Sequence, residues 1–262
     1  MRLFDTIKNI FKIEDLRARI IYTLGIILLY RFGKYVTLPG VDPSQLGNLS
    51  DQTSQGIMGL LDMFSGGAFS QASVFALGIM PYISASIVIQ LLGIVFPYFQ
   101  KLQREGESGR RKMNQYTRYL TVAILLLQGP SYLVNLSRTL PATAFVLSGP
   151  FFKISSVIIL TAGTMFVMWL GEKITDKGIG NGISLIIMIG IIARLPQSFV
   201  FELGTRINGS GGLVSLLIEL VVLFAIMMAT IMLVQGTRRI PVQYARRIVG
   251  NKQYGGVRQY IP

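Results

Sequence analysis

The sequence contains, at residues 213–234, the run LVSLLIELVVLFAIMMATIMLV. Glu219 is the only charged residue in this run. A membrane-spanning helix needs roughly 20 consecutive apolar residues, because the hydrocarbon layer is about 30 Å thick and a helix rises about 1.5 Å per residue. The run therefore predicts a transmembrane helix and indicates a membrane protein.

The composition of the whole chain agrees with this class. Of its 262 residues, 51% are apolar types and only 14% are charged, whereas a typical soluble domain carries about a quarter charged residues. The apolar content also excludes a disordered chain. The chain has no Cys and no His, which excludes a disulfide scaffold and removes the side chains that zinc, haem and Ser–His or Cys–His sites commonly use. We therefore expect an all-α polytopic membrane protein without a cofactor.

Apolar runs and turn signals divide the chain into six spans. We predict transmembrane helices over residues 20–36, 74–98, 119–136, 153–170, 183–201 and 213–235. The remaining segments are an amphipathic N-terminus, 1–19, the connections 37–73, 99–118, 137–152, 171–182 and 202–212, and the tail 236–262. The fifth span is the least typical, since its apolar run before Pro196 is short enough for a re-entrant or half-helix. Residues 57–64 are apolar but too few to cross.

The basic residues test this arrangement. With six crossings, the N-terminus, the connections 99–118 and 171–182 and the tail share one side of the membrane, and they hold 19 of the 25 Lys and Arg residues. Cytoplasmic loops carry an excess of Lys and Arg. The charge distribution therefore predicts six spans with the N-terminus in the cytoplasm.

Two of these cytoplasmic segments carry more basic residues than orientation requires. The first contains REGESGRRK at 104–112, and the tail begins GTRRIPVQYARR at 236–247. Taken alone, the first is explained by topology. The two together also suit docking of a polyanion such as RNA, or contact with anionic lipid. Apolar and polar residues alternate at 240–244, which predicts a strand.

Two patterns around the spans leave alternatives open. Glycines alternate within residues 178–182, which favours a tight turn, while phosphate binding is the weaker alternative because no known phosphate motif is matched. Isoleucines recur four residues apart in the pairs Ile79/Ile83 and Ile183/Ile187. They are either lipid-facing or core residues, or a constriction that gates a pore by dewetting. Spacing alone does not choose between these.

Other classes of membrane protein need groups that the sequence does not supply. A small-solute transporter needs convergent polar groups near the midplane, and a proton-coupled pump needs a relay of ionisable side chains. Glu219 is an ionisable group within a span and so a functional hypothesis by default, but it lies near the outer end, where it reaches water. An intramembrane enzyme needs a Ser/Lys or Asp pair at depth, whereas every Asp lies in a predicted connection or in the N-terminus. We therefore predict that the chain is not an enzyme.

A series of motifs resembles one family. The motifs are LPGVD at 38–42, FSGGA at 64–68, FALGIMPYISAS at 75–86, REGESGRRK at 104–112, QYTRY at 115–119, GTMF at 163–166, MWLGE at 168–172 and GIGNGIS at 178–184. In this order along the chain they are similar to bacterial SecY, the channel subunit of the protein-export translocon.

The resemblance implies a fold of ten spans in two pseudo-symmetric halves around an hourglass pore. This chain looks like the first half, through the sixth span and into the cytoplasmic loop that follows. Alone, this half is not expected to form a working channel. The C-terminal half of SecY is therefore an implied partner, either as more of this chain or as a separate one. A fragment that does not translocate is the alternative.

The resemblance also implies roles for individual residues. The first half of the pore ring, which closes around a passing chain, matches Ile79, Ile83, Ile183 and Ile187. One side of the lateral gate matches Ser84, Ser86 and Gln90, together with the third span. A short re-entrant plug helix matches Met63, Phe64, Ser65, Gly66, Gly67, Ala68, Phe69 and Ser70. The face where ribosomes or the SecA motor dock matches Arg104, Arg110, Arg111, Lys112, Lys177, Arg238, Arg239, Arg246, Arg247 and Lys252.

The function implied by the resemblance is transport without chemistry. Such a channel passes unfolded secretory polypeptides across the bacterial inner membrane and releases transmembrane segments sideways into lipid. The ribosome or SecA supplies the energy. The implied partners are SecE and SecG, SecA, the ribosome with its RNA, signal sequences and nascent chains, and anionic lipids.

Overall fold

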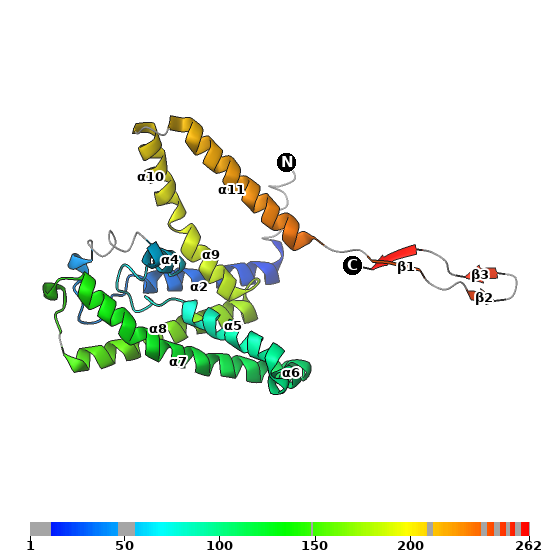
Figure 1. Ribbon diagram of the computed structural model, residues 1–262, viewed down its shortest axis with the longest axis horizontal. Coiled ribbons are helices and arrows are strands. Elements are labelled where there is room, and N and C mark those ends of the chain that lie inside the picture. The colour runs from blue at the N-terminus through cyan, green and yellow to red at the C-terminus, as the bar shows by residue number, and fades with distance from the viewer. Residues whose placement is uncertain are drawn as a thin grey trace. The chain divides into compact units, whose positions relative to one another are not determined.

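The computed structural model describes residues 12–46, 56–147, 149–208 and 212–236, and four short strands in the tail (Figure 1). The helices are α2 (Glu14–Gly33), α4 (Gly56–Phe64), α5 (Met80–Val95), α6 (Pro97–Arg104), α7 (Glu107–Thr139), α8 (Pro150–Lys177), α9 (Gly182–Ile192), α10 (Leu195–Asn208) and α11 (Gly212–Gln235). Two short 3-10 helices are η1 (Pro43–Gln45) and η2 (Ala142–Ala144). The chain forms two compact units, Met1–Gln197 and Ser198–Pro262.

The first unit is built around the long helices α7 and α8. These two helices pack on each other, α5 and α6 pack on α7, and α2 and α9 pack on α8 (Figure 1). Glycines permit the closest approaches, because any side chain there would collide with backbone: a Cβ at Gly163 of α8 would lie 2.2 Å from the carbonyl oxygen of Val74. The core therefore lies along α8, with α2, α7 and α9 around it.

Two hydrophobic clusters fill this unit. The first joins the segment before α5 to α7 and α8, and its largest fully buried side chains include Leu38, Leu136 and Leu160. The second joins α2, α8 and α9, and it includes Val167 and Ile186. Burial of aliphatic surface between helices thus fixes where α9 and the chain between α4 and α5 lie.

The predicted fold class, an all-α membrane protein, is confirmed. Within the described residues, α7, α8, the stretch Gly182–Arg206 and Val214–Gln235 are each long and apolar enough to cross a membrane. The pair α5 and α6, bent by 101° at the break between them, would make a fifth crossing if it is one span. Helix α2 has 20 residues but carries two acidic residues in its first turn and Arg31 in its last. The count of six spans therefore stays a prediction.

Several helices begin or end elsewhere than the sequence predicts. The second begins at Met80 rather than at 74, because Gly78 adopts a positive φ of 56° and Pro81 suits a first turn. It ends at Val95, and Pro97 starts α6 in a new direction. Helix α7 already begins at Glu107 and α8 continues to Lys177, so both extend through segments predicted as loops.

The fifth predicted span, 183–201, is divided in two. Helix α9 ends at Ile192 and α10 begins at Leu195, next to Pro196, whose ring prevents a regular helix from continuing into it. Helix α10 then extends to Asn208, into the connection predicted over 202–212.

The second unit contains α11, at nearly the predicted bounds, and the tail. Strands β1 (Ile240–Gln243) and β4 (Arg258–Ile261) form one antiparallel pair, and β2 (Arg247–Val249) and β3 (Lys252–Tyr254) form another. The strand predicted around 240–244 is thereby confirmed. Among the described residues, strands of the named sheets occur only in this tail.

Candidate functional site

The loop that follows α4 is packed directly against α9. Helix α4 ends at Phe64, and Gly66 and Gly67 then adopt φ values of +67° and +89°, a backbone region that strongly favours glycine. A Cβ at Gly66 would lie 3.1 Å from the Cα of Gly190 in α9. The two facing glycines thus allow loop and helix to touch with almost no side chain between them.

Hydrogen bonds from two helices hold this loop. The hydroxyl of Tyr30 in α2 donates to the carbonyl oxygen of Ser65 at 3.3 Å, and that of Tyr132 in α7 donates to the carbonyl oxygen of Phe69 at 3.0 Å. The rings of Phe69 and Tyr132 also meet edge to face, with centroids 4.9 Å apart. The loop is therefore anchored on both sides.

The structure places the predicted plug residues in this loop, with a different local conformation. We predicted a short helix over the whole set, but only Met63 and Phe64 lie in a helix, at the end of α4. Residues 65–70 form successive turns and are all buried. The two positive φ values end the helix, which is why the helical part comes before this set rather than within it. We call residues 63–70 the plug segment.

The four predicted pore-ring isoleucines meet in one hydrophobic cluster. Ile79 is fully part of it, and Ile83, Ile183 and Ile187 are half-buried against it. Ala68 of the plug segment belongs to the same cluster. A group of aliphatic side chains excludes water and ions while it stays closed. The arrangement can therefore form a seal, with the plug segment as part of it.

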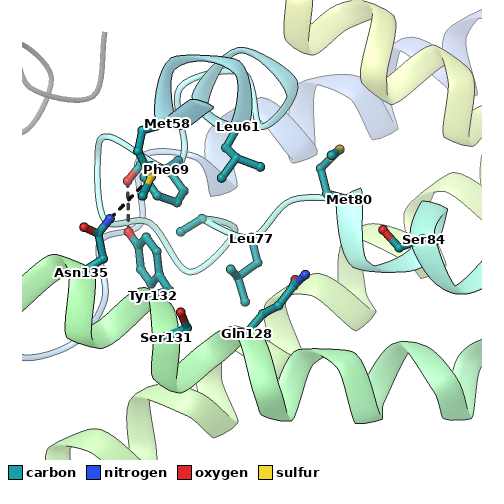
Figure 2. Close-up of a pocket in the computed structure, with 11 residues that line it drawn as sticks. Met58, Leu61, Phe69, Leu77, Met80, Ser84, Gln128, Ser131, Tyr132 and Asn135 are labelled. Atoms are coloured by element: carbon teal, nitrogen blue, oxygen red, sulfur yellow. Dashed lines mark hydrogen bonds between the residues drawn. The ribbon is translucent and has the colours of Figure 1, made fainter. Parts of the chain in front are cut away.

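The predicted lateral-gate residues lie on α5. The amide of Gln90 donates to the hydroxyl of Ser86 at 3.1 Å, and Ser84 and Gln90 are exposed. Ser84 also lines a cavity of about 240 Å³ between α4, α5 and α7 (Figure 2). The cavity is lined mainly by apolar side chains, among them Met58, Leu61 and Leu77.

Three polar residues that we did not predict complete this cavity. Gln128, Ser131 and Asn135 of α7 line it (Figure 2). The amide of Asn135 donates to the sulfur of Met58 at 3.6 Å, which links α7 to α4. Their spacing of three and four residues within an apolar run places them on one face of a helix, and that signal could have identified them.

A charged group beside the plug segment was also missed. Asp62 of α4 lies 2.5 Å from a guanidinium nitrogen of Arg194, and Arg31 of α2 donates to the carbonyl oxygen of Ile189 at 2.8 Å. Arg31 and Arg194 lie within predicted spans and are not among the 19 basic residues assigned to the cytoplasmic side. Asp62 is the only charged residue in the otherwise apolar segment 57–64, and this signal could have indicated that it has a charged partner.

Five of the predicted docking residues lie at one end of the first unit. Arg104 is at the end of α6, and Arg110, Arg111 and Lys112 are in the first turns of α7, all exposed. Exposed Lys177 ends α8, and a paired contact of Arg118 with Glu172, at 2.6 and 3.2 Å, joins that end of α8 to α7. Arg238, Arg239 and Arg246 lie outside the described residues, and Arg247 and Lys252 lie in β2 and β3.

The structure bears on two further features of the sequence, the glycine-rich turn at 178–182 and Glu219. The side chain of Asn181 accepts hydrogen bonds from the amides of Ile183 and Ser184, so the first turn of α9 is capped by the protein itself. This arrangement supports the tight turn rather than phosphate binding. Glu219 of α11 pairs with Arg206 at 2.5 Å, which accounts for its charge without a transport role.

Fold and site together define a polytopic helical membrane protein with a buried, turn-rich segment packed on an aliphatic cluster. The family model for SecY matches residues 73–262. The chain is 47% identical, over 260 residues, to the protein translocase subunit SecY of Corynebacterium glutamicum, and the match covers 96% of this chain and 58% of that protein. The chain belongs to the SecY family.

Solved structures agree on the fold. A protein-conducting channel matches with a TM-score of 0.54 at 18% identity, over 94% of this chain and 52% of that one. A second structure matches with a TM-score of 0.50 at 17% identity, over 93% of this chain and 52% of that one. Its description states that the plug domain of SecY stabilises the closed state of the translocation channel and maintains a membrane seal. The present chain spans just over half the length of the SecY relative that it matches.

Proposed function

We propose that this chain forms the first half of a protein-conducting channel in the bacterial inner membrane. The channel passes unfolded secretory polypeptides across the membrane and releases transmembrane segments into lipid through a lateral gate. Membership of the SecY family supports this function. The observation that carries it is the plug segment: its residues 65–70 are buried, it packs against α9, and its Ala68 lies in the cluster that contains Ile79 and contacts the other three pore-ring isoleucines.

The proposed mechanism uses packing rather than chemistry. The aliphatic cluster and the plug segment exclude ions while the channel rests, because a dry apolar constriction resists the entry of water. A passing polypeptide displaces the plug segment, and the isoleucine side chains then close around it. A segment that is apolar enough leaves past Ser84, Ser86 and Gln90 into lipid. The energy comes from the ribosome or from SecA.

The proposed topology places the N-terminus in the cytoplasm and uses six spans, 20–36, 74–98, 119–136, 153–170, 183–201 and 213–235. The basic ends of α6, α7 and α8 then face the ribosome or SecA, and anionic lipid headgroups, because these partners carry negative charge. SecE, SecG and the C-terminal half of SecY are the proposed membrane partners.

A cross-linking experiment tests this function. The full-length protein with its membrane partners carries a photoreactive residue at Ile83 or Ile187, and a secretory precursor is arrested during export. We expect the precursor to cross-link at both positions, because a chain in the pore must pass the ring. Val88 is the control on α5, since five residues turn its side chain about 140° away from Ile83.

The outcomes separate the alternatives. Cross-links at Ile83 and Ile187 that require a signal sequence, without cross-links at Val88, support a pore at this site. Equal cross-linking at Ile83 and Val88 would contradict it, because the precursor would then pass α5 without facing the ring. Failure of the full-length protein to export any precursor would contradict the channel function itself.

A further inference from the structure

The carboxylate of Asp62 is the most buried charged group among the described residues. Its side chain is only 2% exposed, at the end of α4 and next to the plug segment. A buried carboxylate is costly unless it is paired and hydrogen-bonded. It receives both: Arg194 lies 2.5 Å away, and the backbone amide of Ser70 donates to it at 2.8 Å. Asp62 therefore depends on both partners to remain where it is.

Arg194 contacts the residue just before the plug segment and the last residue of the segment. Besides its ion pair with Asp62, its guanidinium donates to the hydroxyl of Ser70 at 3.2 Å. The backbone of Asp62 accepts a further bond from the amide of Gly67 at 2.8 Å. One guanidinium thus closes the loop from residue 62 to residue 70. Because Arg194 is the second residue after α9, it also fixes this loop to the helix that carries Ile183 and Ile187.

Two further cations lie beside the loop that this pair closes. Arg31 donates to the carbonyl oxygens of Gly66 and Ile189, and a Cβ on Gly67 would lie 2.9 Å from the ammonium nitrogen of Lys34. Arg31, Lys34 and Arg194 also line one cavity. Without Asp62 these cations would repel one another, and without Arg194 the buried carboxylate would lose its ion pair.

We propose that Arg194 is a positioning residue that holds the plug segment in its packed place through Asp62. The proposal rests on the proposed channel function for its consequence but not for its geometry. Arg31, Lys34, Arg194 and Ser70 line a cavity of about 730 Å³, so the pair lies at the border between the buried loop and open space. We expect loss of the pair to let water reach the loop from this cavity and so to loosen the plug segment.

Cysteine labelling tests the geometry without requiring transport. The sequence contains no Cys, and Ala68 in the plug segment is 1% exposed. A single Ala68→Cys is introduced into the full-length complex, with any cysteine of the remaining segment replaced, and is labelled with a membrane-impermeant maleimide. We expect Arg194→Gln to raise the labelling rate about tenfold. Arg194→Lys, which keeps the charge but not the two-pronged contact, restores part of the protection.

A double-mutant cycle shows whether the two residues act together. We expect Asp62→Asn with Arg194→Gln to label no faster than the faster single variant, because the second change removes nothing further from a broken pair. Arg118→Gln is the matched control, since it breaks an ion pair of similar length between α7 and α8 that does not touch the plug segment. We expect it to label like the parent. Equal labelling of Arg194→Gln and the parent would overturn the proposal, as would strictly additive single effects.

Ion leak through the resting complex in liposomes separates this proposal from the channel function. If Arg194→Gln raises both labelling and leak, the pairing of Arg194 with Asp62 helps to keep a channel sealed. If labelling rises and leak does not, Arg194 positions the segment and the isoleucine cluster alone keeps the seal; failure of the parent to export a precursor is the outcome that would contradict the channel function. If neither changes while the parent still exports a precursor, the channel function stands and the role of Arg194 is refuted.

Discussion

Gly163 offers a direct test of the contact between α8 and the chain before α5. An alanine Cβ there would lie 2.2 Å from the carbonyl oxygen of Val74, about 1.2 Å inside the 3.4 Å at which ordinary contact begins. Neither backbone can move without disturbing the core around it. Overpacking of this kind typically costs about 1–3 kcal/mol. We therefore expect Gly163→Ala to lower the free energy of unfolding by that amount, although alanine is the better helix former.

Gly25→Ala supplies the matched control. It is the same change within a predicted membrane-spanning helix, but apart from the adjoining backbone of its own helix no atom lies within 4 Å of the added Cβ. We expect its free energy of unfolding to stay level or to rise by less than about 1 kcal/mol. The assay is unfolding of the full-length protein in mixed detergent micelles at increasing denaturant, followed by circular dichroism. Equal midpoints for the two variants would refute the close approach between α8 and Val74.

Three further changes each remove the hydrogen bonding of one side chain. Tyr132→Phe removes the donor to the buried carbonyl of Phe69, and we expect a loss of about 1–2 kcal/mol in the same unfolding assay. Asn181→Ala removes the cap of α9, which typically costs about 1 kcal/mol, and faster hydrogen exchange in the first turn of α9 would report it. Thr23→Val removes the acceptor for the amide of Ile179 at 3.2 Å, so faster exchange of that amide is expected.

Each of these changes has its own control. Tyr119→Phe alters a side chain that is 70% exposed and should leave the unfolding midpoint unchanged. Asn181→Asp keeps an acceptor at the cap and should retain slow exchange. Thr230→Val removes only a bond to the preceding turn of its own helix, so its stability effect should be small. A Tyr132→Phe variant as stable as Tyr119→Phe would contradict the anchoring role of that hydroxyl.

The sequence predicted those features that depend on local composition. The long apolar run became α11, and alternation at 240–243 became β1. The bounds of α7 were missed because its first turns are charged but helix-forming, so the helix continues beyond the apolar run that hydropathy detects. The start of α5 depends on the conformation of Gly78, which no periodic pattern reveals.

The candidate site, too, was predicted only in part. The resemblance pointed to the plug segment and the four isoleucines, and the structure brings them together in or beside one cluster. The pairing of Asp62 with Arg194 joins positions far apart along the chain, and a single sequence does not reveal which distant residues lie close together in space. The polar face of α7 was missed because its three residues lie in a run that already qualified as a span.

The non-helical chain that precedes α5 has a consequence for assembly. Helix α5 has 16 residues, about 24 Å of rise, which is less than the hydrocarbon layer requires. If the predicted second span crosses the membrane, residues 65–79 supply the missing length without a helix; all of them are buried or half-buried, with the amide of Val74 bonded to Val36 and that of Leu38 to Ala72. Irregular backbone is tolerated at membrane depth only where protein surrounds it. Residues 65–79 are therefore suited to lie at membrane depth only once α2, α7 and α8 cover them, and α8 is synthesised nearly a hundred residues later.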